Sequence, residues 1–203
     1  KSKMKLKKYL LLLFLLFSIS TIAQSQYDDL PIAEKIRFKE SNAPYLSSAK
    51  TSSGSTPVIL TTGPEQQCNS AIPVCQNIYT TSASYSGNGT SQEIPSNTCL
   101  GSNELNSVWY TFTSSSAGNI AFNITPNVIG QDYDFALYNL TGTNCSAISS
   151  GALTPIRCNF SATGGVTGLS ASGTNPSEPA SGPNQSTVLA TAVGQTYVLI
   201  ISN

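Results

Sequence analysis

Two stretches decide the fold class, NSVWYTFT at residues 106–113 and DYDFALYNL at residues 132–140. In both, apolar side chains recur at every second position, which is the spacing that places them on one face of a β-strand. In the first stretch Val108, Tyr110 and Phe112 share one face, and the residues between them take the other. Each stretch therefore predicts a strand.

The same alternation continues towards the C-terminus. It is present in GNIAFNIT at 118–125, in TVLATAV at 187–193 and in TYVLIIS at 196–202. The turn-forming residues 117–119 predict a hairpin between the first stretch and 118–125, and Gly194-Gln195 predicts a second hairpin. The chain is thus expected to form strands joined by short turns.

No stretch after residue 23 shows a sustained apolar period of 3.6 residues. We therefore predict an all-β fold, an antiparallel jelly-roll-like β-sandwich over residues 67–203. The sequence ends directly after the strand at 196–202, and a sandwich cut there would expose an unpaired strand edge. From this we expect residues 1–203 to be the N-terminal part of a longer polypeptide that lacks its last strand or strands.

The first 23 residues have the pattern of a secretory signal peptide. Lysines precede an apolar run from Leu10 to Ala23, and Thr21-Ile22-Ala23 ends the run with residues that a signal peptidase accepts. We predict cleavage between Ala23 and Gln24. A membrane anchor is the alternative, but the run is shorter than the roughly 20 residues that span a bilayer. Residues 24–66 are rich in Ser and Thr and are predicted to be a linker.

Charge and composition restrict the chemistry of the remaining chain. Residues 24–203 carry five basic and ten acidic side chains, a net charge of about −5, and beyond Thr62 the only basic residue is Arg157. Nucleic acid is therefore not expected as a partner, because binding phosphates needs clustered Lys and Arg. The sequence contains no His. This excludes Ser-His-Asp and Cys-His catalysis and His-ligated zinc sites, and we expect no enzymatic activity.

The five cysteines predict disulfides in an oxidising compartment. Cys145 and Cys158 bracket a loop between two predicted strands and form the preferred pair, worth about 3 kcal/mol on the chain-entropy model. Cys99 is expected to pair with Cys75 or with Cys68, which leaves one cysteine without a partner in these residues. A thiolate metal site lacks the usual C-x-x-C spacing.

Carboxylates offer the remaining candidates for a metal site. Asp132 and Asp134 lie two positions apart on a predicted strand, and Glu104 precedes the neighbouring strand. Oxygen ligands of this kind suit calcium, and a pair of carboxylates can also act as the acid and base of a glycosidase-like site. The plainer interpretation is that both carboxylates accept hydrogen bonds from nearby backbone donors. Trp109 and Tyr110 allow a second interpretation, in which aromatic rings stack on sugars, against the plainer one that they fill the core.

A series of short blocks resembles the N-terminal module of large surface proteins of gliding Bacteroidetes. The blocks are CNSAIPVC (68–75), NSVWYTF (106–112), AGNIAFNITP (117–126), DYDFALY (132–138), PIRCN (155–159), TGL (167–169), SGPN (181–184) and GQTYVLIISN (194–203). Proteins of this kind typically end in a gliding-motility-associated type B sorting domain that the type IX secretion system reads. The resemblance implies export by Sec and then by the type IX system, and display at the cell surface.

Two functions follow as hypotheses. The first is a non-catalytic extracellular module that binds a glycan or another surface ligand in adhesion, gliding motility or matrix interaction. The second is an accessory substrate-binding module of a secreted hydrolase whose catalytic domain lies beyond residue 203. In both, the mature protein has no membrane span.

Overall fold

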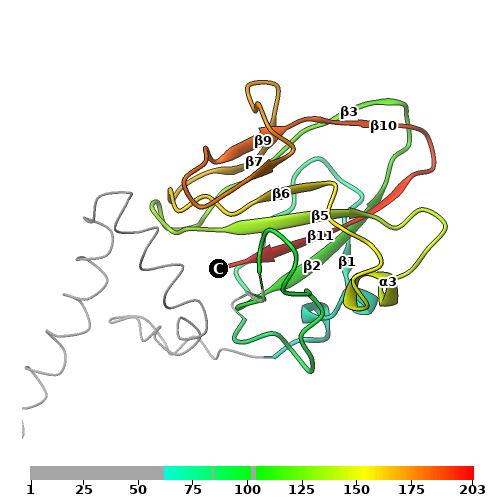
Figure 1. The fold of residues 1–203 in the computed structure, drawn as a ribbon, viewed down its shortest axis with the longest axis horizontal. Coiled ribbons are helices and arrows are strands. Elements are labelled where there is room, and N and C mark those ends of the chain that lie inside the picture. The colour runs from blue at the N-terminus through cyan, green and yellow to red at the C-terminus, as the bar shows by residue number, and fades with distance from the viewer. Residues whose placement is uncertain (1–61, 84, 102–103) are drawn as a thin grey trace, which may run out of the picture.

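The computed structural model describes residues 62–83, 85–101 and 104–203. These residues form two layers of β-strands, with short helical segments gathered at one end (Figure 1). The predicted signal peptide, most of the predicted linker and the predicted cleavage site between Ala23 and Gln24 lie outside the described residues. The folded part begins earlier than the predicted position 67, because Gln66 is fully buried.

The larger layer is a six-stranded sheet in the order β1-β2-β11-β5-β6-β8. Its strands are β1 (Ile72–Pro73), β2 (Val108–Thr113), β5 (Asp134–Asn139), β6 (Arg157–Asn159), β8 (Ser177–Glu178) and β11 (Thr196–Ser202). The β11 strand pairs antiparallel with β2 on one side and with β5 on the other. The last strand of the sequence therefore lies inside the sheet, and the expectation that one or more further strands follow it stays a prediction.

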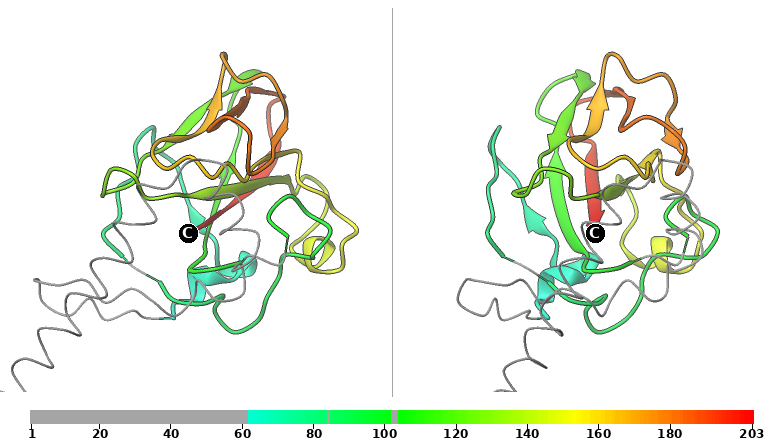
Figure 2. Two further views of the ribbon diagram at one scale, coloured as in Figure 1. Left: turned by 60° about the vertical axis from the view of Figure 1, so that its left-hand side comes forward. Right: turned by 90° about the vertical axis from the view of Figure 1, so that its left-hand side faces the viewer.

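The second layer contains β3 (Gly118–Ile120), β4 (Phe122–Ile124), β7 (Thr167–Ser170), β9 (Gln185–Thr187) and β10 (Leu189–Thr191). Only one residue separates β3 from β4, and one separates β9 from β10, so each pair is nearly continuous. The β10 strand pairs with β3, whereas β7 lies between β4 and β9. Figure 2 shows this layer packed against the larger sheet.

The all-β prediction is confirmed, and the two layers form a sandwich. The central pairs are antiparallel as predicted, but β1 with β2, β6 with β8 and β7 with β9 are parallel. The jelly-roll connectivity stays a prediction.

Both predicted hairpins are wrong. The predicted strand at 118–125 forms β3 and β4, and neither pairs with β2. The β3 strand pairs with β10, and β4 pairs with β7. Likewise β10 pairs with β3 and not with β11. At each of these turns the chain crosses from one layer to the other, because strands consecutive in sequence bury their apolar faces against each other instead of sharing a ladder.

The large sheet is buried on both faces. In β5, Phe135 and Leu137 belong to the core between the two layers, whereas Ala136 and Tyr138 belong to a second core on the opposite face. The alternation was thus predicted correctly, but the second face is covered by loops instead of water. Trp109, fully buried, lies in that second core.

Two disulfides hold the covering loops to this second face. One joins Cys68 in η3 (Cys68–Ser70) to Cys145 directly before α3 (Ser146–Ser149), with Cα atoms 5.8 Å apart. The other joins Cys99 to Cys158 in β6, with Cα atoms 6.4 Å apart. All four cysteines line or adjoin the same core.

The predicted pairs Cys145–Cys158 and Cys75–Cys99 are therefore wrong. Each observed bridge links the segment before β2 to the second half of the domain, with sequence separations of 77 and 59. Closeness in sequence was a poor guide because the bridges join loops that cover one face of the sheet. Cys75 is free and exposed.

Candidate functional site: a groove at the open side of the sandwich

The two sides of the sandwich are closed to different extents. At the β6 side the layers are joined by direct hydrogen bonds: Arg157 donates from Nε to the Thr187 carbonyl and from Nη2 to the Val188 carbonyl, at 2.8 and 2.6 Å. Ser186 Oγ also donates to the Cys158 carbonyl at 2.8 Å. Burial lowers the pKa of Arg157, which stays the donor in these contacts.

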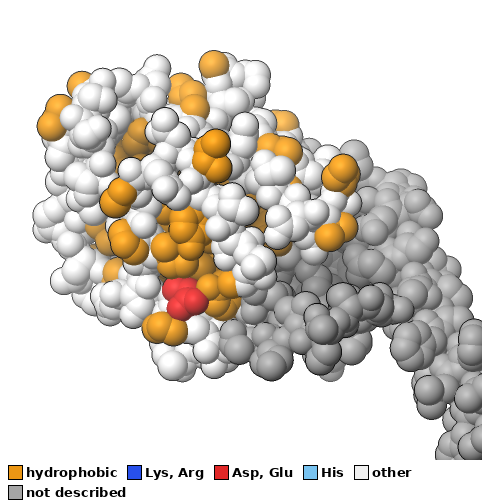
Figure 3. All heavy atoms as spheres, turned by 180° about the vertical axis from the view of Figure 1, so that it is seen from behind, with side chains coloured by type: hydrophobic (Ala, Val, Ile, Leu, Met, Phe, Trp, Pro, Cys, Tyr) orange, Lys and Arg blue, Asp and Glu red, His pale blue; other side chains and the backbone are white. Residues whose placement is uncertain are grey.

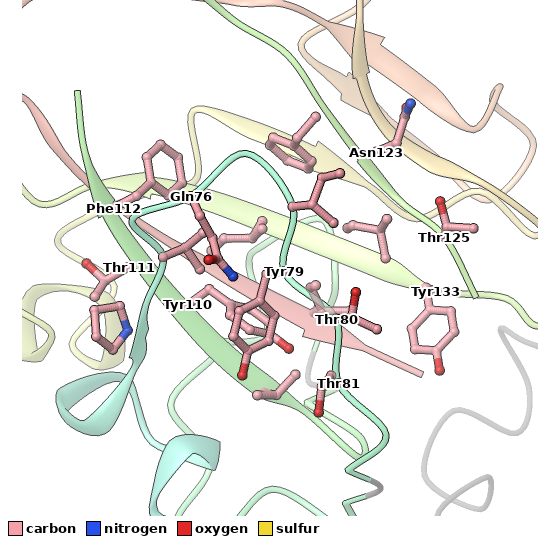
Figure 4. A pocket seen from close by; sticks show the side chains of 18 of the residues that line it. Gln76, Tyr79, Thr80, Thr81, Tyr110, Thr111, Phe112, Asn123, Thr125 and Tyr133 are labelled. Carbon is pink, nitrogen blue, oxygen red and sulfur yellow. The ribbon is translucent and has the colours of Figure 1, made fainter. Parts of the chain in front are cut away.

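The opposite side is open and contains a groove of about 1400 Å³. The groove runs between β2 with β11 on one wall and the stretch from Ile120 to Asn127, which includes β4, on the other. Figure 4 shows Tyr110 and Phe112 on the first wall and Asn123 and Thr125 on the second. The groove therefore lies between the two layers, on the side where they are not in direct contact.

The lining of the groove is uncharged. Apolar and aromatic side chains from both layers make up its interior, among them Val108, Tyr110, Phe112, Ile120, Phe122, Ile124, Leu199 and Ile201. Amide and hydroxyl side chains such as those of Gln76, Thr80, Thr81, Asn123 and Asn127 stand around them. Among the residues that the structure describes, no Asp, Glu, Lys, Arg or His lines the groove. From behind, Figure 3 shows apolar side chains gathered near the middle of the molecule, with an acidic group at their border and no basic group in view.

Residues 75–83, here called the strap, cross the mouth of the groove. Before the strap, Val74 N still donates to the Thr111 carbonyl at 2.8 Å, as a continuation of β1. Within the strap the side chains from Cys75 to Thr80 are exposed, and no described residue makes a backbone–backbone hydrogen bond with their main chain. At its far end the strap is tied to the second wall by a long contact of 3.4 Å from Asn127 Nδ2 to the Thr81 carbonyl.

An aromatic contact is the main anchor of the strap. The ring of Tyr79 meets that of Tyr110 edge to face, with centroids 5.4 Å apart. Tyr79 is 41% exposed while Tyr110 is buried. Burial is the main cause that raises the pKa of Tyr110 to about 12, and the neighbouring Tyr79 is the second. The Tyr110 ring therefore remains neutral at physiological pH.

A second tyrosine contact marks the end of the groove near Glu65. Tyr85 Oη donates to Glu65 Oε1 at 2.6 Å. Burial raises the pKa of Tyr85, and the hydrogen bond to Glu65 raises it further. This contact holds the residues after the strap to η2 (Pro64–Gln66).

The structure does not bring the predicted metal ligands together. Asp134 is buried at the start of β5, opposite Ser202 of β11, and Asp132 is half-buried two positions before it. Glu104 lies in a different environment, against Trp109. Among the described residues, no group of three or more His, Cys, Asp or Glu side chains could hold a metal ion. Calcium binding by Asp132 and Asp134 stays a prediction.

Glu104 instead organises the loop that covers the second core. Its carboxylate accepts hydrogen bonds from the backbone N–H groups of Glu93 and Ile94 and from Trp109 Nε1, the last two at 3.0 and 3.3 Å. Burial raises the pKa of Glu104 to about 7, although these three donors act in the opposite direction. Burial also raises the pKa of Glu93. The hydrogen bond that its carboxylate accepts from the backbone N–H of Cys68 lowers this pKa, but by less.

The interpretation of Trp109 and Tyr110 as exposed sugar platforms is wrong, and the core interpretation is confirmed. Trp109 is fully buried, and Tyr110 is 7% exposed. The residue that sequence reasoning missed is Tyr79. It stands in no alternating stretch, and the signal that could have found it is the pair Ile78-Tyr79 in an otherwise polar segment.

Comparisons with known proteins add no relative. No family model, curated protein or solved structure matches this chain. The resemblance to surface modules of gliding Bacteroidetes therefore stays a prediction. Within the part of the chain that the structure describes, no helix is long and apolar enough to cross a membrane.

Proposed function

We propose that this chain is a non-catalytic module of a secreted cell-surface protein and that it acts in adhesion by holding a ligand in the groove. The observation that carries the proposal is the lining of the groove, which combines a large apolar interior with uncharged amides and hydroxyls. Pockets of this kind bind by burial and by a few placed hydrogen bonds. Most acid–base catalysis depends on His, Asp, Glu or Lys, and none of these is among the lining residues in the part of the chain that the structure describes.

Secretion and surface display are part of the same proposal. The two disulfides support an oxidising, extracytoplasmic compartment. The basic and apolar pattern of residues 1–23 supports export by Sec. The resemblance to surface modules supports a second step through the type IX system and a part in gliding motility or matrix interaction.

Adhesion of beads that carry the full chain tests this function. Three surfaces are compared: bare glass, a film of a neutral polysaccharide and a film of silk fibroin. We expect adhesion to at least one of them, and a reduction of at least tenfold by Thr125→Arg, because this substitution places an uncompensated charge in the uncharged groove. Thr174→Arg is the matched control. It adds the same charge at an exposed position that does not line the groove, and it should adhere like the unchanged chain.

Equal adhesion of Thr125→Arg and the unchanged chain on every surface would mean that the groove is not the binding site. Absence of adhesion to all three surfaces would also contradict the proposal. Circular dichroism and thermal unfolding of both variants show whether each retains the fold.

A further inference from the structure

The free edge of β4 faces the groove. The sheet order β4-β7-β9 makes β4 an outer strand, and among the described residues it pairs only with β7. The direction in which the main-chain N–H and C=O groups of β4 point can be deduced from its partner residue in β7. Gly168 of β7 stands across from Asn123 and donates its N–H to the Asn184 carbonyl beside β9. In a parallel pair, the N–H and C=O of such a residue point to the same neighbour, so both groups of Gly168 point away from β4.

Asn123 and Gly168 are consequently a pair without mutual hydrogen bonds. In an antiparallel ladder, the main-chain N–H and C=O of a residue in such a pair point outward. Those of Asn123 therefore point away from β7 and into the open side of the sandwich. Its side chain is exposed, while the neighbouring Phe122 and Ile124 turn towards the core between the layers. No backbone hydrogen bond among the described residues joins this edge to the strap.

We propose that the groove binds an extended, uncharged polypeptide segment of a partner, which adds to the edge of β4 as a further strand. A strand edge with unpaired N–H and C=O groups is a template for another strand. The added strand would extend the second layer over the groove and turn every second side chain towards Phe112 and Ile201. The uncharged lining calls for apolar side chains at those positions and for no charge elsewhere in the groove.

The strap allows such a strand to enter. Its main chain from Cys75 to Thr80 makes no backbone–backbone hydrogen bond with the described residues, and Tyr79 is its main anchor. An incoming strand would thus break few contacts and form new main-chain hydrogen bonds with β4. A polysaccharide fits less well, because the interior of the groove is made largely of aliphatic and aromatic side chains. This inference rests on the proposed function, since it names the class of ligand that the groove holds.

A capped peptide of about seven alternating threonine and valine residues is the probe, since this is a common strand length and both residue types favour strands. Its affinity for the full chain is measured by isothermal titration. We expect saturable binding, and at least tenfold slower deuterium exchange of the Asn123 amide when the peptide is bound. The matched control peptide has the same sequence with N-methyl groups on alternate amides. It keeps the side chains but cannot complete the ladder, and it should bind at least tenfold more weakly.

Two variants test the edge from the side of the protein. Asn123→Pro removes the outward N–H and should weaken peptide binding at least tenfold, whereas Asn123→Thr keeps this group and should bind as the unchanged chain does. Proline is tolerated on an edge strand where its missing N–H would face outward. Thermal unfolding shows whether Asn123→Pro is folded, and the N-methylated peptide tests the ladder without any substitution.

Equal binding of the plain and the N-methylated peptide would overturn the inference, as would absence of binding by both. A neutral hexose oligosaccharide is titrated in parallel. If it binds and the peptide does not, the groove takes glycans and the strand proposal fails. In that case adhesion that depends on Thr125 would still stand, so the two proposals fail separately.

Discussion

At the scale of single residues, Glu104 is the side chain whose charge state matters most for the fold. It is almost fully buried, and it joins the loop at Glu93 and Ile94 to Trp109 in the core. The same carboxylate that forms these bonds is costly to ionise there, because burial disfavours the charged form. The contacts between the loop and the core therefore depend on pH.

Acidification should stabilise the protein. The pKa of Glu104 is about 7 in the folded state and about 4.5 in the unfolded state, so the folded state binds more protons between these values. The free energy of unfolding should fall as pH rises from 4.5 to 7 and then level off, by about 3 kcal/mol if the whole shift is expressed. Glu93, whose pKa is also raised, adds to the same trend.

Urea unfolding at pH 5 and pH 8 measures this difference. Glu104→Gln should reduce the difference in the free energy of unfolding between pH 5 and pH 8. It should also lower the free energy of unfolding slightly at acid pH, because the contact with Trp109 is weakened. Asp132→Asn is the control for removing a carboxylate elsewhere. A Glu104→Gln variant with the full pH dependence would show that another group is responsible.

At the scale of elements, the covering loops depend on the disulfides. From residue 62 to β2, the described residues form short helical turns and no long strand, so the bridges from Cys68 and Cys99 fix this segment to the sheet. A cross-link over 59 residues stabilises a fold by about 4 kcal/mol on the chain-entropy model. On this model, the bridges stabilise the folded loops mainly because they reduce the conformational entropy of the unfolded chain.

Peptide mapping without reduction should show two bridges, Cys68–Cys145 and Cys99–Cys158, and an alkylated Cys75. Replacing Cys99 and Cys158 together by Ala should lower the free energy of unfolding by several kcal/mol, up to about 4. Cys75→Ser should leave the free energy of unfolding unchanged, because this side chain is exposed and free. A bridge between Cys145 and Cys158 in the map would contradict the structure.

At the scale of the whole molecule, charged side chains are few in the folded part of the chain. From Thr62 onward the sequence has six acidic residues and one basic residue, and Glu104, Asp134 and Glu178 among the acidic ones are buried. The described residues therefore expose few charged groups, and the absence of a nucleic-acid partner stays a prediction.

The predicted leader belongs to this scale too. Expression of the full chain in a Sec-competent bacterium should yield an exported product whose intact mass begins at Gln24. Ala23→Leu should reduce cleavage, because signal peptidase requires a small residue at this position. An exported product that keeps residues 10–23 would instead indicate a membrane anchor.

The alternation of side chains could be read correctly from the sequence, because it is a local property of an extended chain. It places Phe135 and Leu137 on one face and Ala136 and Tyr138 on the other, as the structure does. Very short strands such as β6 and β8 carry too few residues for a period to show. The predicted compartment also depends on residue types alone, and secretion stays a prediction.

The partners of each strand, the disulfide pairs and the groove were decided by the tertiary structure. The chain crosses between layers after β2 and before β11, because consecutive apolar faces cover each other. That crossing places β11 inside the large sheet and leaves β4 at an open side. Such long-range pairings result from the packing of the whole domain, and no local pattern of residues records them.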